Sequence, residues 1–363
     1  MKTGKNVLMP CCTAAPPFAW RHALLSASVP SIVLAALVGA GSAGGALAQG
    51  KGETVKFQDY PGIGNMLVRV ATAKGYCDKA GIKCVVQPIP SGPLGAQAML
   101  AKSIDSALIS AEVMVGAINK GAKMKMVAGG AVSNVSALIG GNHVPQPNAD
   151  KGWPAFVQDL KGRKIGVPAR GSQMETTTTW MLLKAGLKAE DVIFVAVGGP
   201  VTAYGALASK QVDAIMMFEP AGSICTVLGT CKVIWRGATA KQPAEQYALN
   251  GGGSGLVFTQ DYIDRNPQVI EAVIKAIREA DAFINNAANF DETVKIAETY
   301  FKFDMPKGDE VLRSSLRIAN EANTYRAAIN RNAVKAGLDF LVETKQIDKA
   351  PPVSEIVHDK APQ

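Results

Sequence analysis

Two segments of this chain repeat each other in outline. The stretch GPLGAQAMLAKSIDSALIS begins at Gly92, and GPVTAYGALASKQVDAIMMFEP begins at Gly199. Each has Gly-Pro, an apolar run suited to a helix, a short polar turn, and then an apolar strand preceded by Asp. Two copies are too few for a solenoid, which needs about three stacked units. The repeat therefore predicts a protein built from two similar α/β lobes.

The first 48 residues have the features of a secretory signal peptide. Lys2, Lys5 and Arg21 precede the apolar run SVPSIVLAALVGA, and the motif ALA at 46–48 is typical of a cleavage site. We expect cleavage after Ala48 and export. A membrane anchor is the less favoured alternative, because it needs about 20 apolar residues with different flanks.

The remaining chain is only weakly basic. It carries 35 basic and 30 acidic residues, because three of the 38 Lys and Arg residues lie in the first 48 positions. No run of like charge concentrates this small excess. A nucleic-acid-binding protein gathers Lys and Arg on one face or element, so we expect no nucleic-acid partner.

The four cysteines after the leader form two close pairs, Cys77 with Cys84 and Cys225 with Cys231. In an oxidising compartment an even number at short spacing predicts disulfides. Four cysteines allow three connectivities, and we expect the two local pairs. Neither pair has C-x-x-C spacing, and this part of the chain has two histidines, so we expect no metal site.

From residue 53 onward, predicted strands and helices alternate. This order predicts βαβ units and mostly parallel sheets. Apolar residues at helical spacing over 267–287 predict a long helix that opens with Pro267. Further helices are expected over 291–301, 308–326 and 330–345.

The order of elements also predicts where the two lobes begin and end. We expect the chain to leave lobe one near Ser136 and to return near Leu256. Lobe one then comprises 49–137 and 257–363, with the C-terminal helices as an extension, and lobe two comprises 138–256. Two crossing strands would join the lobes, and such a hinge implies a cleft that closes on a ligand.

Candidate binding residues lie in the loops that follow the predicted strands, because open α/β sheets bind ligands there. Ser91, Ser172 and Thr202 stand at predicted helix starts. A helix start has unpaired N–H groups and a partial positive charge, which suit an oxygen of a carboxylate, sulfonate, nitrate or phosphate. Arg170 lies near such a start and would clamp an anion through two hydrogen bonds. The alternative is that these residues only cap helices and form turns.

The same loops hold aromatic and acidic residues with two alternative roles. Three aromatic residues are candidates for the wall of a pocket or for core packing: Tyr60, Tyr204 and Phe218. Three acidic residues would meet an amine, cap helices or pair with Arg170: Asp59, Glu112 and Glu219.

Motifs for catalysis are missing from the sequence. It has no P-loop and no G-x-S-x-G elbow, and GIGNML has Leu67 where a dinucleotide-binding loop needs its third glycine. No histidine lies near a candidate serine or cysteine nucleophile. We therefore expect neither an enzyme nor a cofactor.

Several motifs, in this order, resemble solute-binding proteins of ABC importers in the NMT1-like group, which serves nitrate, sulfonates, taurine and thiamine precursors. They are SG before AMLAKSIDSALIS, VPARGSQ before a helix ending LLKAGL, ALASKQVDAIMMFEP, and FTQDYIDRNPQVIEAVIKA. The resemblance covers essentially the whole chain after the leader. It implies a type II periplasmic binding protein fold, ligand capture in the periplasm by lobe closure, and delivery to a permease and an ATPase. It also implies a monomer.

The family's binding loops fall on 60–65, 91–92, 110–111, 170–173 and Glu219. Together with the loops above, the expected ligand-binding residues are Tyr60, Gly64, Asn65, Ser91, Gly92, Ser110, Ala111, Ser133, Arg170, Gly171, Ser172, Gln173, Thr202, Tyr204 and Glu219.

One departure from the family leaves the ligand open. The loop DYPGIGN differs from the His-containing loop common in the group. A small organic carboxylate or sulfonate is the leading ligand class. The alternatives are a cationic or heterocyclic solute, such as a pyrimidine, held by Asp59 and Glu219, and a secreted enzyme on the same fold.

Overall fold

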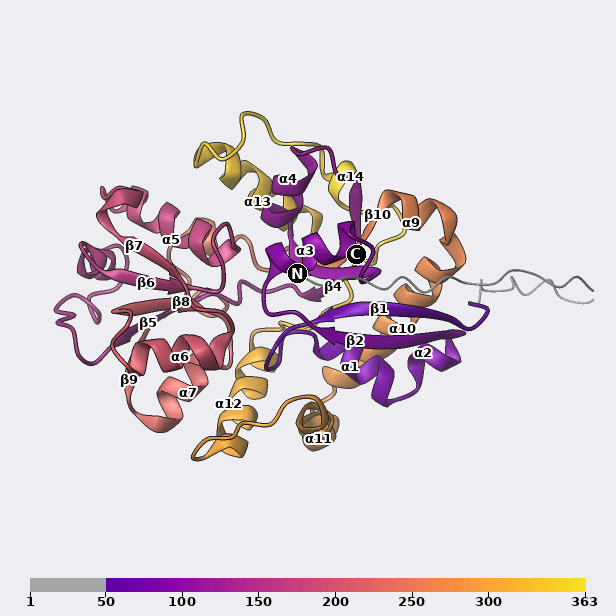
Figure 1. Cartoon of the computed structure of the whole chain (residues 1–363), viewed down its shortest axis with the longest axis horizontal. Helices are drawn as coiled ribbons and strands as arrows, with labels where there is room; N and C mark the ends of the chain where they lie inside the picture. The colour runs from indigo at the N-terminus through magenta and orange to yellow at the C-terminus, as the bar shows by residue number, and fades with distance from the viewer. Residues whose placement is uncertain (1–49) are drawn as a thin grey trace, which may run out of the picture. The chain divides into compact units, whose positions relative to one another are not determined.

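The computed structural model describes residues 50–363, which belong to one compact unit. The predicted signal peptide, 1–48, lies outside the described residues. The described chain forms two five-stranded sheets, each with helices on both faces (Figure 1). This confirms the predicted α/β fold with two lobes.

The first sheet has the strand order β2-β1-β3-β10-β4. β1 runs parallel to β2 and β3, whereas β10 is antiparallel to both of its neighbours. The strands are β1 (Glu53–Asp59), β2 (Ile82–Pro88), β3 (Ser106–Ser110), β4 (Met124–Ala131) and β10 (Ser254–Thr259). The chain thus returns to this sheet through its one antiparallel strand.

The second sheet repeats this plan in the order β7-β6-β8-β5-β9, with β5 antiparallel to β8 and β9. Its strands are β5 (Ala137–Gly141), β6 (Lys164–Val167), β7 (Ile193–Ala196), β8 (Ala214–Met217) and β9 (Cys231–Arg236). The repeated sequence segments form α3 (Gly92–Leu100) and α6 (Pro200–Ala208), each followed by the third strand of its sheet. The sequence repeat is therefore a repeat of structure.

Helices cover both faces of the first sheet (Figure 1). α1 (Met66–Ala73) and α2 (Tyr76–Lys79) pack with α10 (Pro267–Ile284) on one side, and α3 and α4 (Ala111–Ile118) lie on the other. α10 is the predicted long helix. Its apolar stripe faces the core, because four residues at helical spacing are each at most 1% exposed: Val269, Val273, Ile277 and Ile284.

The second sheet has α5 (Gln173–Lys184) on one face and α6 with α7 (Ala221–Leu228) on the other (Figure 1). The shorter helices of the chain are η1 (Ala155–Leu160), η2 (Ala189–Asp191), α8 (Ala244–Tyr247), α9 (Gln260–Arg265) and η3 (Ala287–Asn289).

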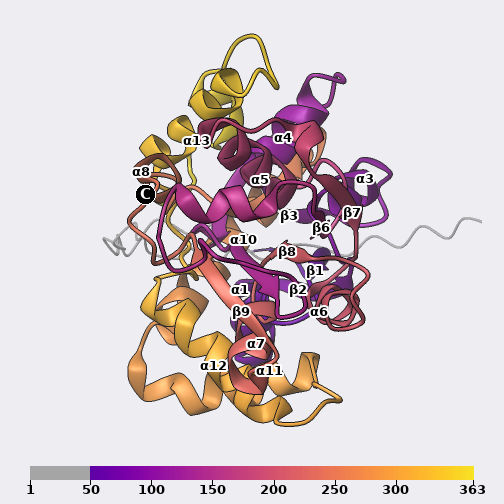
Figure 2. The same cartoon turned by 90° about the vertical axis from the view of Figure 1, so that its left-hand side faces the viewer.

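The C-terminal helices contact both lobes. They are α11 (Phe290–Tyr300), α12 (Gly308–Glu321), α13 (Arg331–Glu343) and α14 (Val353–Ile356). α11 packs on α1, α13 on α4 and α14 on β4, so they extend lobe one. α12 also contacts α7 (Figure 2). The Phe340 ring of α13 lies 5.5 Å from the Trp180 ring of α5.

Two segments connect the sheets, 132–136 between β4 and β5 and 237–253 between β9 and β10. Buried amides join them. The Asn134 N–H donates to Asn250 Oδ1 (2.7 Å), and Asn134 Nδ2 donates to Gln246 Oε1 (3.0 Å). The boundaries of the lobes, 49–137 with 257–363 and 138–256, stay a prediction.

Both expected cysteine pairs lie at disulfide distance. The Cα atoms of Cys77, in α2, and Cys84, in β2, are 5.9 Å apart. Those of Cys225, in α7, and Cys231, at the start of β9, are 5.1 Å apart. Each pair therefore joins a helix to the next strand, as expected.

Candidate ligand-binding site

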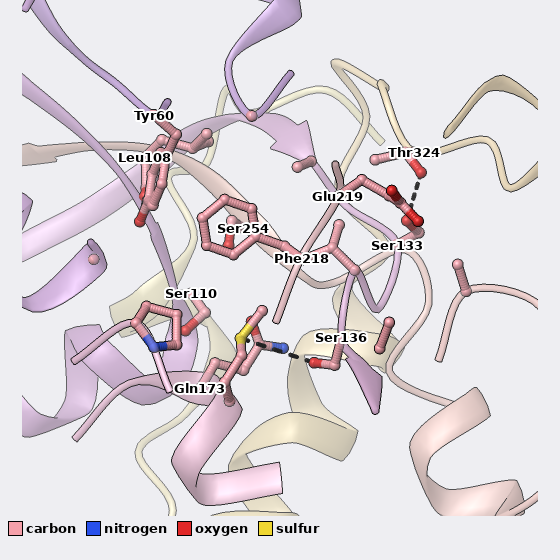
Figure 3. A pocket seen from close by; sticks show the side chains of 18 of the residues that line it. Tyr60, Leu108, Ser110, Ser133, Ser136, Gln173, Phe218, Glu219, Ser254 and Thr324 are labelled. Carbon is pink, nitrogen blue, oxygen red and sulfur yellow. Dashed lines mark hydrogen bonds between the residues drawn. The ribbon is translucent and has the colours of Figure 1, made fainter. Parts of the chain in front are cut away.

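Residues from both lobes line a cavity of about 100 Å³ (Figure 3). They come from the loop after β1, the starts of α3, α4 and α5, the crossing segment 132–136, the end of β8, and α12 with the residues after it. The cavity thus lies beyond the carboxyl ends of strands in both sheets, where the fold predicts a ligand.

A buried ion pair between Arg69 and Asp59 holds the loop after β1 in place. Arg69 of α1 donates through Nε to Asp59 Oδ1 (2.9 Å) and through Nη2 to the Tyr60 carbonyl (2.8 Å), and it also bonds the Gly62 carbonyl. Arg69 is 1% exposed and Asp59 is 5% exposed. Burial raises the pKa of the Asp59 carboxyl, and Arg69 counteracts that rise. Asp59 therefore supports the loop and does not line the cavity.

Three serines stand at helix starts on the cavity wall. Ser91, Ser110 and Ser172 are the N-cap residues of α3, α4 and α5, and each side chain is buried. None of the three hydroxyls caps its own helix, and those of Ser91 and Ser172 form no hydrogen bond within the described residues. Buried hydroxyls normally have partners. Within the described residues, Ser91 and Ser172 are therefore free to bond a ligand.

Ser110 has one acidic neighbour. Burial raises the pKa of the Glu112 carboxyl in the first turn of α4, and a hydrogen bond from the Ser110 hydroxyl lowers it in part. Ser91 and Ser172 have no such neighbour among the described contacts. Their hydroxyls, one from each lobe, are therefore the better candidates for hydrogen bonds to a ligand.

Aromatic side chains form the middle of the cavity wall. The Tyr60 and Phe218 rings meet edge to face with centroids 5.5 Å apart. The Tyr60 hydroxyl donates to the Leu108 carbonyl (3.0 Å), and burial raises its pKa. Because the hydroxyl is committed to Leu108, Tyr60 presents mainly its ring to a ligand.

One ion pair lies within the cavity wall. Arg236, the last residue of β9, pairs through Nη1 with Glu219 Oε1, and Glu219 Oε2 accepts the Ser223 N–H (2.9 Å). Both side chains are mostly buried, and burial lowers the pKa of the Arg236 guanidinium. The carboxylate is thus satisfied, whereas Nε and Nη2 of Arg236 have no hydrogen-bond acceptor among the described residues.

A second polar group lies beside Glu219. Ser133 Oγ and Thr324 Oγ1 share a hydrogen bond of 2.7 Å, and Figure 3 shows both grouped with Glu219, apart from Ser110 and Gln173. The cavity wall therefore has one polar region at Glu219, Ser133 and Thr324 and another at Ser110 and Gln173. The rings of Tyr60 and Phe218 belong to the same wall.

The structure brings nine of the fifteen expected residues to the cavity wall: Tyr60, Gly64, Ser91, Gly92, Ser110, Ser133, Ser172, Gln173 and Glu219. It places the other six elsewhere: Asn65, Ala111, Arg170, Gly171, Thr202 and Tyr204.

Local contacts explain the positions of the first four of these six. Asn65 Nδ2 donates to the Gln58 carbonyl (2.7 Å) from a buried site. Ala111 faces the core. Arg170 is exposed, forks onto Glu175 with two bonds of 3.0 and 2.8 Å, and does not meet Glu219. Gly171 is exposed and donates its N–H to the same Glu175 carboxylate.

The remaining two belong to α6, whose start is covered. A Cβ on Gly199 would lie 3.4 Å from Pro61 of the opposite lobe. Thr202 Oγ1 donates to the Val197 carbonyl (2.7 Å), and the Tyr204 hydroxyl bonds Thr230 (2.8 Å) in a separate hollow. The start of α6 therefore does not line the cavity, and its Thr202 hydroxyl is bonded within its own loop.

Residues at the cavity that the sequence did not nominate include Arg236, Thr324 and Tyr325. Arg236 ends a predicted strand, so the strand-end rule would have found it. Thr324 and Tyr325 follow α12 and reach the cavity because Tyr325 pairs with Ala131 of β4. No local sequence signal marks that contact.

No group of metal-binding side chains occurs within residues 50–363, and no helix there is both long and apolar enough to cross a membrane.

A model of the family described as NMT1/THI5 like matches residues 65–287. The chain belongs to the NMT1/THI5-like family. A protein of Brucella abortus, described as a binding protein, is 28% identical over 242 residues, which make up 66% of this NMT1/THI5-like chain and 69% of the relative.

Two solved structures show the fold shared by this NMT1/THI5-like protein. The alkanesulfonate-binding protein SsuA of Xanthomonas axonopodis, bound to MOPS, matches with a TM-score of 0.66 at 17% identity, over 85% of this chain and 98% of SsuA. The periplasmic nitrate-binding protein NrtA of Synechocystis matches with a TM-score of 0.59 at 16% identity, over 86% and 92%. The periplasmic binding protein fold expected from the sequence is therefore confirmed.

Proposed function

We propose that this protein is the substrate-binding component of an ABC importer and that it captures a small organic anion, a carboxylate or sulfonate, in the cavity between its lobes. It acts as a carrier and not as an enzyme. The predicted signal peptide would export it to the periplasm, where a permease and an ATPase take over the ligand. We expect a monomer.

One observation carries the choice of an anion. The hydroxyls of Ser91, Ser110 and Ser172 stand at the starts of three helices that face one cavity, and those of Ser91 and Ser172 have no partner within the described residues. Helix starts offer unpaired N–H groups and partial positive charge. An oxygen-rich anion satisfies these donors, whereas an ammonium group cannot, because it has no acceptor lone pair.

The charges on the wall limit the ligand further. Arg236 and Glu219 are the charged residues among the described lining, and they neutralise each other. The helix starts therefore have to balance the ligand's charge. This favours a single negative charge over two.

The structure gives less support to a cationic ligand held by Asp59 and Glu219. Asp59 is held by Arg69 outside the cavity, and both oxygens of Glu219 have donors. The anion proposal is also in line with the alkanesulfonate- and nitrate-binding proteins that share the fold.

Lobe closure is part of the proposal. The cavity wall comes from both lobes, and two crossing segments join them. A ligand that bonds Ser91 from one lobe and Ser172 from the other stabilises the form in which the two meet. Such differential affinity is what shifts a two-state equilibrium.

A thermal-shift screen of the oxidised protein after leader removal tests the proposal. The probes are nitrate, methanesulfonate, propanesulfonate and benzoate, with propylammonium and a neutral pyrimidine as comparisons. A ligand at 100 times its dissociation constant adds about 2.7 kcal/mol to the free energy of unfolding. A shift with anions supports the proposal, and shifts confined to propylammonium or the pyrimidine overturn it.

Serine variants then locate the site. Ser91→Ala and Ser172→Ala should each weaken the best anion at least tenfold, because a hydrogen bond to a charged group contributes about 1.5–3 kcal/mol. Ser103→Ala, in an exposed turn, is the control and should leave affinity unchanged. Unchanged affinity in both cavity variants would remove the serines from the site.

A further inference from the structure

We infer that Gln58 is a positioning residue, which places the Ser91 hydroxyl and the start of α4 at the ligand without touching the ligand itself. The inference rests on the proposed function of the cavity. Gln58 is fully buried in β1 and is not among the residues that line the cavity.

The strands β1 and β3 pair at a single position. Their pairing is confined to Phe57 opposite Ser106, and two residues further along β3 the Leu108 N–H bonds the Gln58 side chain in place of a backbone carbonyl of β1. Backbone groups left unpaired at such a point need other partners. Gln58, the next residue of β1, supplies them with its side chain.

The Gln58 amide bonds both sides of the gap. Its Oε1 accepts the Leu108 N–H of β3 (3.1 Å), and its Nε2 donates to the carbonyls of Ser91 (2.9 Å) and Ile89 (3.2 Å). One buried amide thus ties β1, β3 and the loop before α3. All three of these bonds end on backbone atoms.

The helix α3 is built to receive this amide. A Cβ on Gly95 would lie 1.9 Å from Gln58 Oε1 and 2.4 Å from its Cδ, so glycine leaves the space that the amide fills. The Gly95 N–H in turn donates to the Ser91 carbonyl (3.0 Å), the same oxygen that Gln58 Nε2 bonds. Gln58 and the first turn of α3 therefore hold Ser91 together.

The effect extends to β3 and the start of α4. The Leu108 N–H is held by Gln58 and the Leu108 carbonyl by the Tyr60 hydroxyl (3.0 Å). Leu108 lines the cavity, and Ser110 follows it two residues later. Two of the three helix starts at the cavity thus depend on contacts with the end of β1.

The test uses Gln58→Glu. This change keeps the acceptor for Leu108 but turns an oxygen toward the two carbonyls, so the Ser91 loop should move away. Gln87→Glu, exposed on the neighbouring strand β2, is the matched control. Gly95→Ala disturbs the same amide from α3 and serves as the second variant if Gln58→Glu does not fold.

Amide hydrogen exchange gives a result without any ligand. We expect at least tenfold faster exchange of the Gly95 amide in Gln58→Glu, and of the Gly95 and Leu108 amides in Gly95→Ala, with unchanged exchange in the second sheet and no effect of Gln87→Glu. Unchanged exchange of the Gly95 amide in Gln58→Glu, or an increase spread evenly over both sheets in either variant, overturns the inference.

A double-mutant cycle gives the binding result, with whichever of nitrate, methanesulfonate, propanesulfonate or benzoate binds best. Gln58→Glu should lower affinity at least tenfold when Ser91 is present and less in a Ser91→Ala background, because part of its effect passes through Ser91. Equal losses in both backgrounds indicate a general structural role and overturn the inference. If no anion binds, the proposed function fails, and the amide hydrogen exchange measurement alone tests the positioning role of Gln58.

Discussion

Arg236 and Glu219 form an ion pair in the cavity wall, in which the carboxylate has donors for both oxygens and the guanidinium keeps donors that find no acceptor within residues 50–363. The pair joins the ends of β8 and β9, which are separated in their sheet by β5. A Cβ on Gly222 would lie 2.6 Å from Arg236 Nη1 and 2.7 Å from Glu219 Oε1. The glycine in the first turn of α7 therefore leaves room for the pair.

Replacing Arg236 by Met should weaken anion binding at least tenfold. The change removes free donors and leaves Glu219 as an unpaired negative charge in the cavity, and a hydrogen bond to a charged group is worth about 1.5–3 kcal/mol. Calorimetric titration with the best anion of the screen measures the effect.

Arg170→Met is the matched control for this variant, because Arg170 is exposed and pairs with Glu175 outside the cavity. We expect it to bind anions as the parent protein does. A loss of affinity in Arg170→Met with none in Arg236→Met would place the anion where the sequence alone suggested.

Reduction of the Cys77–Cys84 pair should cost less than about 3 kcal/mol of unfolding free energy, because the loop it closes is shorter than 15 residues. For a chain of this size the melting temperature should fall by a few degrees. Melting curves with and without a phosphine reductant measure the change.

The double variant Cys77→Ser with Cys84→Ser separates the two pairs. Its melting temperature should respond less to the reductant than that of the parent protein. A response as large as the parent's would assign the stabilisation to Cys225 and Cys231 instead.

The sequence predicted the fold in detail because the elements carry their own signals. Gly-Pro starts, apolar strands and the stripe of α10 are local features, and they recur in the order of a known family. The crossing strands β5 and β10 could be placed because each follows a complete set of βαβ units.

The site was predicted less fully because side-chain direction depends on neighbours far along the chain. Arg170 and Arg236 both stand near strand ends, but Arg170 turns to Glu175 and the ring of Phe194, 5.8 Å away. Arg236 turns inward because Glu219 and the space over Gly222 receive it. The residues adjacent to Arg170 and Arg236 in the sequence do not predict either orientation.

Trp180 should report ligand binding by its fluorescence. It is 1% exposed in α5, stacks on Trp153 with centroids 5.7 Å apart, and meets Phe340 of α13. Ser172 begins the same helix at the cavity. A ligand that draws the lobes together should therefore change the packing around this ring.

Single tryptophan variants check this assignment. Trp180→Phe should abolish most of the emission change caused by the best anion, whereas Trp235→Phe should preserve it, because Trp235 belongs to neither α5 nor α13 and its indole donates to the Gln242 carbonyl (2.8 Å). Retention of the full change in Trp180→Phe would mean that α5 and α13 do not move relative to each other.

Arg69→Met should produce a protein whose stability falls as pH rises. Burial already raises the pKa of Asp59, and Arg69 is the group that opposes this rise. Without Arg69 the folded-state pKa of Asp59 rises further above its unfolded value, which is about 4. The folded state then binds the proton more tightly, so the free energy of unfolding decreases as pH rises from about 4 through the folded-state pKa.

At neutral pH the variant should lose about 3–5 kcal/mol, the cost of leaving one partner of a buried ion pair alone. Urea unfolding between pH 4 and 8 measures both the loss and its slope. Adding Asp59→Asn should remove the slope, because the titrating carboxyl is gone. A slope that persists in the double variant would assign the pH dependence to another group, and a deficit that is constant with pH would show that Asp59 stays ionised without Arg69.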